Sequence, residues 1–151
     1  MKKEYRFDFE NYAARTAMSA PDRELANLAT EACNNAWAPY SHFRVGAAAR
    51  LRSGTILTGS NQESEVFPAG MCAERTLLFN WQAHHADDLM EAIAIASIPG
   101  KRECYPCGQC RQLLLDSERR QGTPIRVIMC SDTTASVVES AADLLPFGFE
   151  L

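Results

Sequence analysis

The stretch Ala92-Ile93-Ala94-Ile95-Ala96 is an unbroken apolar run, with a charged residue just before it and Pro99 shortly after it. A short apolar run with such boundaries is typical of a strand that is covered on both faces. Ile125–Cys130 repeats this pattern, and a helix is expected between the two runs, from Cys107 to about Arg119. A strand, a helix and a strand in this order predict the centre of an α/β sheet.

Two more strands are expected upstream of this unit. Arg44–Leu51 and Thr55–Ser60 have the composition of strands, and Arg52-Ser53-Gly54 between them reads as a hairpin turn. A further helix is expected to start near Gly70 and to run through Trp81. Because helices and strands alternate along the chain, we predict one mixed sheet with helices on both faces.

The N-terminal part is expected to add another helix. Ser19 or Asp22 can cap it, Pro21 lies in its first turn, and an apolar stripe runs from Leu25 to about Trp37. We therefore expect this helix to lie against the sheet through its apolar stripe.

The two ends of the chain carry weaker patterns. Tyr5, Phe7 and Phe9 alternate with charged residues, as in a short strand or an arm, and Val137-Val138 is compatible with a last strand. We expect residues 1–151 to form a single α/β domain in which residues 1–18 are an N-terminal extension.

Composition excludes several classes of protein. Of the 151 residues, 46% are hydrophobic and 23% are charged, which is ordinary for a globular domain and excludes a disordered chain. With 15 basic and 19 acidic residues the net charge is −4, which argues against nucleic acid as a partner and favours a small substrate. Neither a secretory segment nor an apolar stretch long enough for a membrane is recognisable. We expect a cytoplasmic protein whose six cysteines are reduced, which favours a metal site over disulfides.

Three cysteines have the spacing and the setting of metal ligands. Cys107 and Cys110 lie three residues apart, so both sulfurs face the same side of a first helical turn. Cys72 lies at the start of the other expected helix, and helix N-termini favour the thiolate form. Three thiolates around zinc leave the fourth position for water, as in a catalytic site. The sequence therefore predicts a zinc ion bound by these three cysteines.

Other readings of the cysteines and histidines remain open at this point. Cys33 and Cys130 are expected to be buried apolar side chains. Cys104 extends the pair to C-x-x-C-x-x-C, but an iron–sulfur run needs a further cysteine where Leu114 stands. A closed structural zinc site would take Cys104 or a histidine as its fourth ligand, and the candidate histidines are His42, His84 and His85.

Two charged residues beside Cys72 distinguish catalysis from metal storage. Glu74 lies about 200° around an ideal helix from Cys72, so the two side chains are badly placed to chelate one ion. A carboxylate beside the metal can instead accept a proton from metal-bound water and pass it on. Arg75 lies on the same face as Cys72, where its guanidinium can offset the negative charge of a trithiolate zinc site. The alternative interpretation is that Glu74 and Arg75 are ordinary charged residues of a first helical turn with no role at a metal.

These residues lie in blocks that resemble the cytidine deaminase family, in its small three-cysteine form. The resemblance extends from about Leu25 to Phe149. Its blocks are Ala38-Pro39-Tyr40-Ser41-His42-Phe43-Arg44-Val45-Gly46-Ala47-Ala48, Asn61-Gln62-Glu63, Cys72-Ala73-Glu74-Arg75-Thr76, Pro106-Cys107-Gly108-Gln109-Cys110-Arg111-Gln112 and Leu144-Leu145-Pro146. It implies a three-layer α/β/α sandwich with a mixed five-stranded sheet, and zinc-dependent hydrolysis of cytidine or deoxycytidine to uridine or deoxyuridine and ammonia, in pyrimidine salvage.

The resemblance also implies roles for individual residues. One zinc ion per subunit is bound by Cys72, Cys107 and Cys110, with Arg75 behind the metal and Glu74 as the catalytic proton carrier. The substrate-binding residues that it implies are Phe43 for the base, Asn61 and Glu63 for the ribose hydroxyls, and Ala73. It further implies a homotetramer, in which Phe67 and Phe149 contact the sites of neighbouring subunits.

The chain departs from the family pattern at a few positions. After Asn61-Gln62-Glu63 the family commonly continues Asn-Ala-x-Tyr, whereas this chain has Ser64-Glu65-Val66-Phe67. Tyr105 stands where a serine usually precedes the Pro-Cys pair. None of these residues is an implied zinc ligand or proton carrier, so the departures bear on the choice of substrate.

Three alternative functions follow from these observations. Glu65 would favour a cationic substituent, as in a cytosine nucleoside antibiotic of the blasticidin kind. A non-catalytic binding domain stabilised by zinc would have four protein ligands and no open coordination position. A nucleic-acid editing enzyme is the weakest alternative, because the basic pairs Lys101-Arg102 and Arg119-Arg120 are short.

Overall fold

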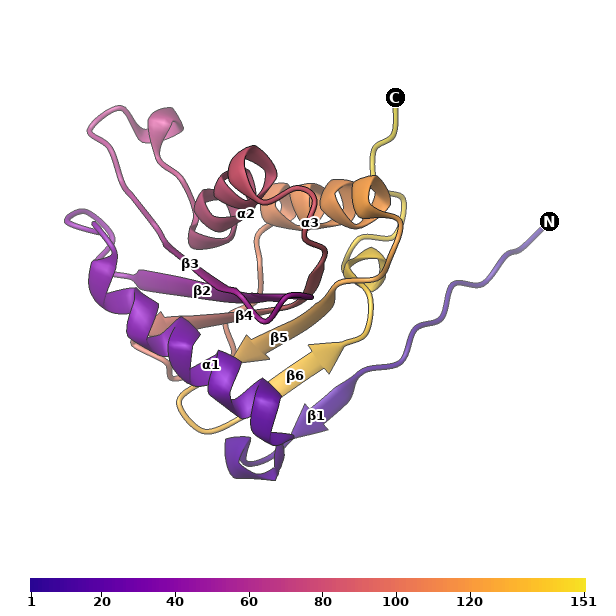
Figure 1. Ribbon diagram of the computed structural model, residues 1–151, viewed down its shortest axis with the longest axis horizontal. Helices are drawn as coiled ribbons and strands as arrows, with labels where there is room; N and C mark the ends of the chain where they lie inside the picture. Colours follow the sequence, from indigo (N-terminus) through magenta and orange to yellow (C-terminus); the bar gives the residue numbers. More distant parts are fainter.

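The computed structural model describes residues 1–151, which contain one six-stranded sheet with the strand order β1-β6-β5-β4-β2-β3. The strands are β1 (Glu10–Tyr12), β2 (Arg44–Leu51), β3 (Ile56–Ser60), β4 (Met90–Ile98), β5 (Arg126–Cys130) and β6 (Ala135–Val138). The helices are α1 (Ala20–Ala32), α2 (Ala73–His84) and α3 (Gly108–Gln121), with short 3-10 helices η1 (Arg15–Ala17), η2 (Cys33–Asn35), η3 (Phe67–Ala69) and η4 (Ala141–Leu144). Helix α1 lies on one side of the sheet, and α2 and α3 lie on the other (Figure 1). The predicted mixed sheet with helices on both faces is therefore confirmed.

Strand β4 is the centre of the sheet and is covered on both faces. It pairs antiparallel with β2 and parallel with β5. Ile93 and Ile95 belong to the core cluster that also contains the buried leucines of α2 and α3. The alternating alanines of β4 belong to a second cluster, together with Leu25 and Ala29 of α1. Large side chains thus fill the layer under two helices, whereas small ones let α1 lie close to the sheet.

Two glycines allow the helices to approach the strands directly. A Cβ atom on Gly46 in β2 would lie 2.1 Å from the backbone oxygen of Ala29 in α1. A Cβ atom on Gly59 in β3 would lie 2.6 Å from the backbone oxygen of Ala73, at the start of α2. Because only glycine fits at such distances, these positions set how closely α1 and the N-terminus of α2 pack on the sheet.

Most of the expected elements are present with small shifts at their ends. The Ser19 side chain accepts a hydrogen bond from the backbone N–H of Asp22 and caps α1, as predicted. The hairpin between β2 and β3 is also confirmed, with Gly54 at a positive φ of 91°. The first helix ends earlier than expected, because Cys33–Asn35 form a 3-10 turn. None of the helices has both the length and the apolar character needed to cross a membrane.

Of the two alternatives predicted for Tyr5–Phe9, a strand or an arm, the structure shows the arm. Residues Glu10–Tyr12, rather than Tyr5–Phe9, form β1, which pairs antiparallel with β6 and makes the sheet six-stranded instead of five-stranded. The physical reason is the short length of β6: Glu10 already pairs with Val137, next to the last residue of that strand. Residues 1–9 continue past the sheet as an extended segment that leads away from the body (Figure 1). We call this segment the N-terminal arm.

Candidate active site

Three cysteine sulfurs meet where α2 and α3 begin. Cys72 is the N-cap residue of α2 and Cys107 is the N-cap residue of α3, and neither side chain caps its own helix. Cys110 lies in the first turn of α3 and is fully buried. The fold thus brings together two helix starts that lie 35 residues apart in the sequence. Their backbone N–H groups favour negative charge on the sulfurs.

The distances between the sulfurs suit a tetrahedral metal ion. The Sγ atoms of Cys72 and Cys107 are 3.9 Å apart, and those of Cys107 and Cys110 are 3.5 Å apart. All three ligand atoms lie within 4.8 Å of one another. Tetrahedral zinc with Zn–S bonds of about 2.3 Å places its sulfurs about 3.8 Å apart. The group contains neither Cys104 nor a histidine, so a closed site would lack its fourth protein ligand.

The charges around Cys72 also suit a bound cation. Hydrogen bonds from the Cys110 thiol, the Arg75 guanidinium and the Cys107 thiol lower the pKa of Cys72 to about 5, although burial opposes this shift. A terminal nitrogen of Arg75 lies 3.8 Å from the Cys72 sulfur, while its buried Nε has no hydrogen-bond partner. The Arg75 guanidinium is therefore directed at the sulfur cluster. A zinc ion with three thiolates would carry a negative charge there, which the guanidinium would offset. The donor set and its surroundings fit zinc.

Glu74 is the buried acid next to this cluster. It is the second residue of α2, its exposed fraction is 3%, and it lines the cavity described below. Burial raises the pKa of its carboxyl group to about 7. A carboxyl group in such a place can carry a proton between a reacting water molecule and a bound ligand.

A cavity of about 410 Å³ opens beside the sulfurs. It unites residues of strand β2, of several loops and of two helix starts, and a volume of this size suits a small molecule. Of the residues singled out from the sequence, its lining contains Phe43, Asn61, Glu63, Cys72, Glu74, Arg75 and Cys107.

Asn61 and Glu63 hold one wall of this cavity in place. The Asn61 side chain accepts a hydrogen bond of 2.7 Å from the Val45 N–H and donates one of 2.9 Å to the Phe43 oxygen. The Glu63 carboxylate accepts hydrogen bonds from the backbone N–H groups of Tyr40 and Ser41 and from the Ser41 hydroxyl. Both residues thus shape the loop that carries Phe43, and each keeps polar atoms at the cavity surface.

The other site residues predicted from the sequence do not line this cavity within a single chain. Cys110 lies behind it as part of the sulfur cluster, and Ala73 is fully buried at the start of α2. Phe67 lines a neighbouring hollow, which Ser41 and Glu63 share with the cavity. Phe149 is exposed, and its backbone is hydrogen-bonded to the Gln112 side chain of α3. Glu65 lines neither of the two hollows.

The cavity is also lined by residues that the sequence motifs did not predict as site residues. Ser41 and Val45 lie inside a family block, so their position in that block was the available signal. Tyr105 was noted only as a departure, and Cys104 only as a possible fourth ligand. Burial raises the pKa of Cys104 to about 12, so it borders the cavity as a neutral thiol. The remaining members of the lining are Gly70 and Met71.

Comparisons with known proteins agree with this geometry. The family model of the cytidine and deoxycytidylate deaminase zinc-binding region matches residues 19–122, which include all three cysteines and Glu74. A cytidine deaminase of Halalkalibacterium halodurans is 36% identical over 96 residues, covering 63% of this chain and 71% of that protein. A cytidine deaminase of Mycobacterium tuberculosis is 38% identical over 93 residues, covering 61% of this chain and 68% of that protein.

Solved structures show the same relationship. The crystal structure of cytidine deaminase from Burkholderia pseudomallei superposes with a TM-score of 0.74 at 32% identity, covering 87% of this chain and all of that one. The structure of cytidine deaminase from Mycobacterium tuberculosis has a TM-score of 0.67 at 30% identity, covering 85% of this chain and 96% of that one. With a matching fold, a matching zinc-binding region and a three-sulfur site, the chain belongs to the cytidine and deoxycytidylate deaminase family of zinc-dependent hydrolases that act on C–N bonds.

Proposed function

We propose that this protein hydrolyses the amino group at C4 of cytidine and deoxycytidine, releasing ammonia and forming uridine or deoxyuridine. One observation carries the proposal: a buried carboxyl group, Glu74, lines the same small cavity as Cys72 and Cys107, two of the three clustered sulfurs. The names of the relatives support the same reaction. The three reduced cysteines of the site favour the cytoplasm as its location.

Cys72, Cys107 and Cys110 would hold the zinc ion. When bound, zinc lowers the pKa of a water ligand to about 7 and so supplies a nucleophile at neutral pH. Arg75 donates to the Cys72 sulfur and offsets the negative charge of the three thiolates, which keeps this sulfur in a fixed orientation.

Glu74 moves the protons of the reaction. The C4–N4 bond breaks and a C4–O bond forms, so the protons of water must reach ring N3 and the departing amine. The buried Glu74 carboxyl accepts a proton from the attacking water, passes it to N3, and later gives a proton to the leaving ammonia. Because this side chain is shielded from solvent, these transfers run between the carboxyl group and the substrate.

The cavity walls orient the nucleoside. Phe43 and Val45 offer apolar surface for the flat base. Ala73, buried at the start of α2 next to Glu74, is a further predicted substrate contact. Asn61 and Glu63 bind the sugar hydroxyls with the hydrogen-bonding capacity that their loop contacts leave free, since a carboxylate offers about four acceptor positions.

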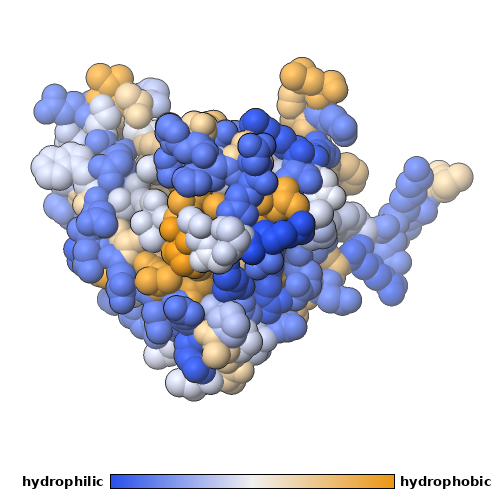
Figure 2. Space-filling view, in the orientation of Figure 1, coloured by the Kyte–Doolittle hydropathy of each residue, from blue (hydrophilic) through white to orange (hydrophobic).

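We further propose that the protein works as a homotetramer in which neighbouring chains complete each site. Phe67 and Phe149 are 73% and 66% exposed, although both are large apolar side chains. The loop that contains η3 protrudes from the body, and apolar atoms gather at its tip and at the C-terminal end (Figures 1 and 2). Light scattering is expected to give four times the mass of one chain, and the Phe149→Asp variant is expected to dissociate and lose activity together.

The reaction itself is tested by separating metal binding from turnover. Glu74→Gln should keep one zinc ion per chain and lose about 10²–10⁴-fold in kcat on cytidine, because it removes the proton carrier but none of the sulfurs. Ultraviolet absorbance and ammonia release measure turnover, and elemental analysis measures zinc. Activity equal to the wild type would refute the role of Glu74. A metal-edge spectrum with four protein ligands would favour the non-catalytic binding domain instead.

A further inference from the structure

Tyr105 lies between two hollows of the molecule. It lines the cavity together with Cys104 and Cys107, and it also lines a second hollow of about 190 Å³. The lining of this second hollow also contains Phe7 and Phe9 of the N-terminal arm. Tyr105 is the one residue that the two linings share, so its ring separates the cavity from the groove under the arm.

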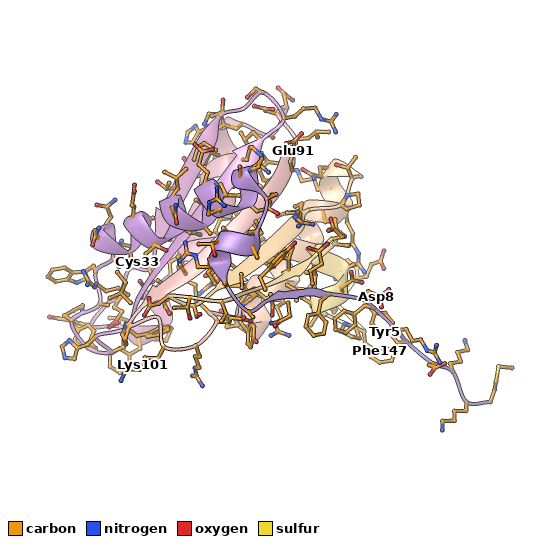
Figure 3. All side chains as sticks on the ribbon, turned by 90° about the horizontal axis from the view of Figure 1, so that it is seen from below. Tyr5, Asp8, Cys33, Glu91, Lys101 and Phe147 are labelled. Atoms are coloured by element: carbon orange, nitrogen blue, oxygen red, sulfur yellow. The ribbon has the colours of Figure 1, made fainter.

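The arm contacts the fold at a few points. Directly after the arm in the sequence, β1 pairs with β6. Within the arm, the Tyr5 hydroxyl lies 3.4 Å from the backbone oxygen of Ala142. The rings of Tyr5, Phe7 and Phe9 follow one another at centroid distances of 6.3 Å. Alternate residues of an extended segment point to the same side, so these rings form one aromatic row. Figure 3 shows Tyr5 on the same side of the molecule as Phe147, near the C-terminal end.

The hydroxyl group of Tyr105 is fixed from another direction. It donates a hydrogen bond of 3.0 Å to the Glu103 carboxylate, whose other oxygen accepts one of 2.9 Å from the Thr134 hydroxyl. The neighbouring backbone oxygen of Thr133 accepts a hydrogen bond of 2.7 Å from the Arg15 N–H. The N-terminal extension therefore approaches Tyr105 in two ways, through the hollow that Phe7 and Phe9 line with it and through this turn.

The position of Tyr105 along the cavity indicates which part of a substrate it meets. Ser41 and Glu63 line both the cavity and the hollow that contains Phe67. Tyr105 lines both the cavity and the groove under the arm. The cavity thus has a Glu63 side and a Tyr105 side. With the sugar at Glu63, as in the proposed function on which this inference rests, Tyr105 borders the base.

We propose that Tyr105 is a specificity-determining residue that limits the size of the base, and that Phe7 and Phe9 are positioning residues that keep its ring at the cavity. The ring is 58% exposed and has open space behind it, so its own packing does not hold it there. Phe7 and Phe9 of the aromatic row border that space. A bulkier base is rejected because the ring, backed by the arm, occupies the room that its substituent needs.

The test compares cytidine with 5-methylcytidine, which carries one extra methyl group on the base. In Tyr105→Ser the ratio of kcat/KM for 5-methylcytidine to that for cytidine should rise about tenfold, the lower range for one methyl group in an apolar pocket. The change should lie mainly in KM, whereas Tyr105→Phe should keep the wild-type ratio because it keeps the ring. Binding of both nucleosides to the inactive Glu74→Gln protein, measured by calorimetry, should show the same change in relative affinity.

Coupling between the arm and Tyr105 is tested by a double-mutant cycle. Phe9→Ala should raise the same ratio in the wild-type background and leave it unchanged in the Tyr105→Ser background, because the two residues act through one ring. Phe9→Leu should restore part of the wild-type ratio. Tyr5→Ala is the matched control, since Tyr5 belongs to the same aromatic row but does not line the groove. Thermal unfolding of each variant shows that the fold is intact.

The outcomes separate the two proposals. Wild-type protein that releases no ammonia from cytidine would overturn the proposed function and this inference with it. Active protein whose ratio is unchanged in Tyr105→Ser would overturn the specificity role alone. Equal effects of Phe9→Ala in both backgrounds, or an equally large effect of Tyr5→Ala, would overturn the positioning role of the arm.

Discussion

The Cys72 sulfur shows how single residues prepare the metal site. Its neighbours donate hydrogen bonds from two thiols and one guanidinium, so this sulfur is the one that most readily carries the negative charge. Cys110, by contrast, is buried and its pKa is raised by its hydrogen bond to Cys72 and by burial. All three sulfurs would hold a metal ion as thiolates, and their protons would be released on binding.

Removing the guanidinium should weaken metal binding without removing a ligand. In Arg75→Met the apolar stem is kept and the charge next to Cys72 is lost, so zinc affinity should fall about 10–100-fold, as for other residues behind a metal ligand. Competition with a chromogenic chelator measures this affinity. Arg119→Met, a partly exposed arginine at the other end of α3, is the control and should bind zinc as the wild type does. Equal affinities of the two variants would contradict the role of Arg75.

Two cysteine-to-alanine variants separate ligands from core residues. Cys107→Ala removes an exposed sulfur of the cluster and should abolish tight zinc binding. Cys33→Ala removes a buried sulfur that lies outside the cluster, and it should lose some stability but keep its zinc. Zinc content and thermal unfolding are measured on both proteins. Zinc retained by Cys107→Ala would contradict the three-sulfur site.

The Glu63 carboxylate makes the cavity loop sensitive to acid. The Ser41 hydroxyl and the N–H groups of Ser41 and Tyr40 hold the pKa of Glu63 below its ordinary value, although desolvation opposes this shift, and the nearby His42 adds to the lowering. An unfolded glutamate has a pKa of about 4.3, so this stabilisation is complete above that pH and is lost as the pH falls through the lower folded pKa. Thermal unfolding curves of wild type and Glu63→Gln should therefore differ at neutral pH and converge in acid. A constant difference across pH would contradict this assignment.

At the scale of elements, the glycines of β2 and β3 decide how the helices lie. Gly46 faces the backbone of α1, and Gly59 faces the start of α2, where Cys72 and Glu74 are found. Close packing of a helix on a strand backbone leaves little freedom at that helix start. The position of the sulfur and of the carboxyl group therefore depends on strand residues that never touch a substrate.

A methyl group at Gly46 should push α1 away from β2. Gly46→Ala would place a carbon atom 2.1 Å from the Ala29 oxygen, and overpacking of this kind costs roughly 1–3 kcal/mol of unfolding free energy. Gly108→Ala is the matched control, because a Cβ atom there meets nothing within 4 Å and alanine favours a helix. Chemical denaturation of both variants measures the difference. A Gly46→Ala protein as stable as Gly108→Ala would show that α1 adapts freely.

At the scale of the whole molecule, the metal joins two separate parts of the fold. Helix α2 connects β3 to β4, and α3 connects β4 to β5, so the sulfurs belong to different connections of the sheet. Between Cys72 and Cys107 the chain runs through the whole of α2, then through β4 and the loop that follows it. Zinc therefore acts as a crosslink between two helix starts, and its binding energy adds to the stability of the folded state.

Removal of zinc should lower the melting temperature. At a free zinc concentration 100 times the dissociation constant, binding stabilises the folded state by about 2.7 kcal/mol. For a chain of this length that corresponds to roughly 5–10 °C in Tm. Calorimetry before and after treatment with a strong chelator measures the shift, and added zinc should restore it. The Cys107→Ala variant, treated in the same way, should show no shift, and an unchanged Tm in the wild type would contradict the crosslink.

Local sequence patterns were enough to predict the features that depend on neighbours along the chain. The apolar run of β4, the cap of α1, the hairpin turn and the spacing of Cys107 and Cys110 follow from strand alternation and helix periodicity. The choice of zinc also came from the sequence, through the residue types and their resemblance to a family.

Tertiary structure alone decided the features that depend on distant residues. The sheet brings Cys72 next to Cys107. It also decides which N-terminal residues pair with the free edge of β6, and it places Tyr105 between two hollows. Local sequence patterns do not specify such distances. They constrain a turn or the buried face of an element, but not how elements that are distant in the sequence pack together.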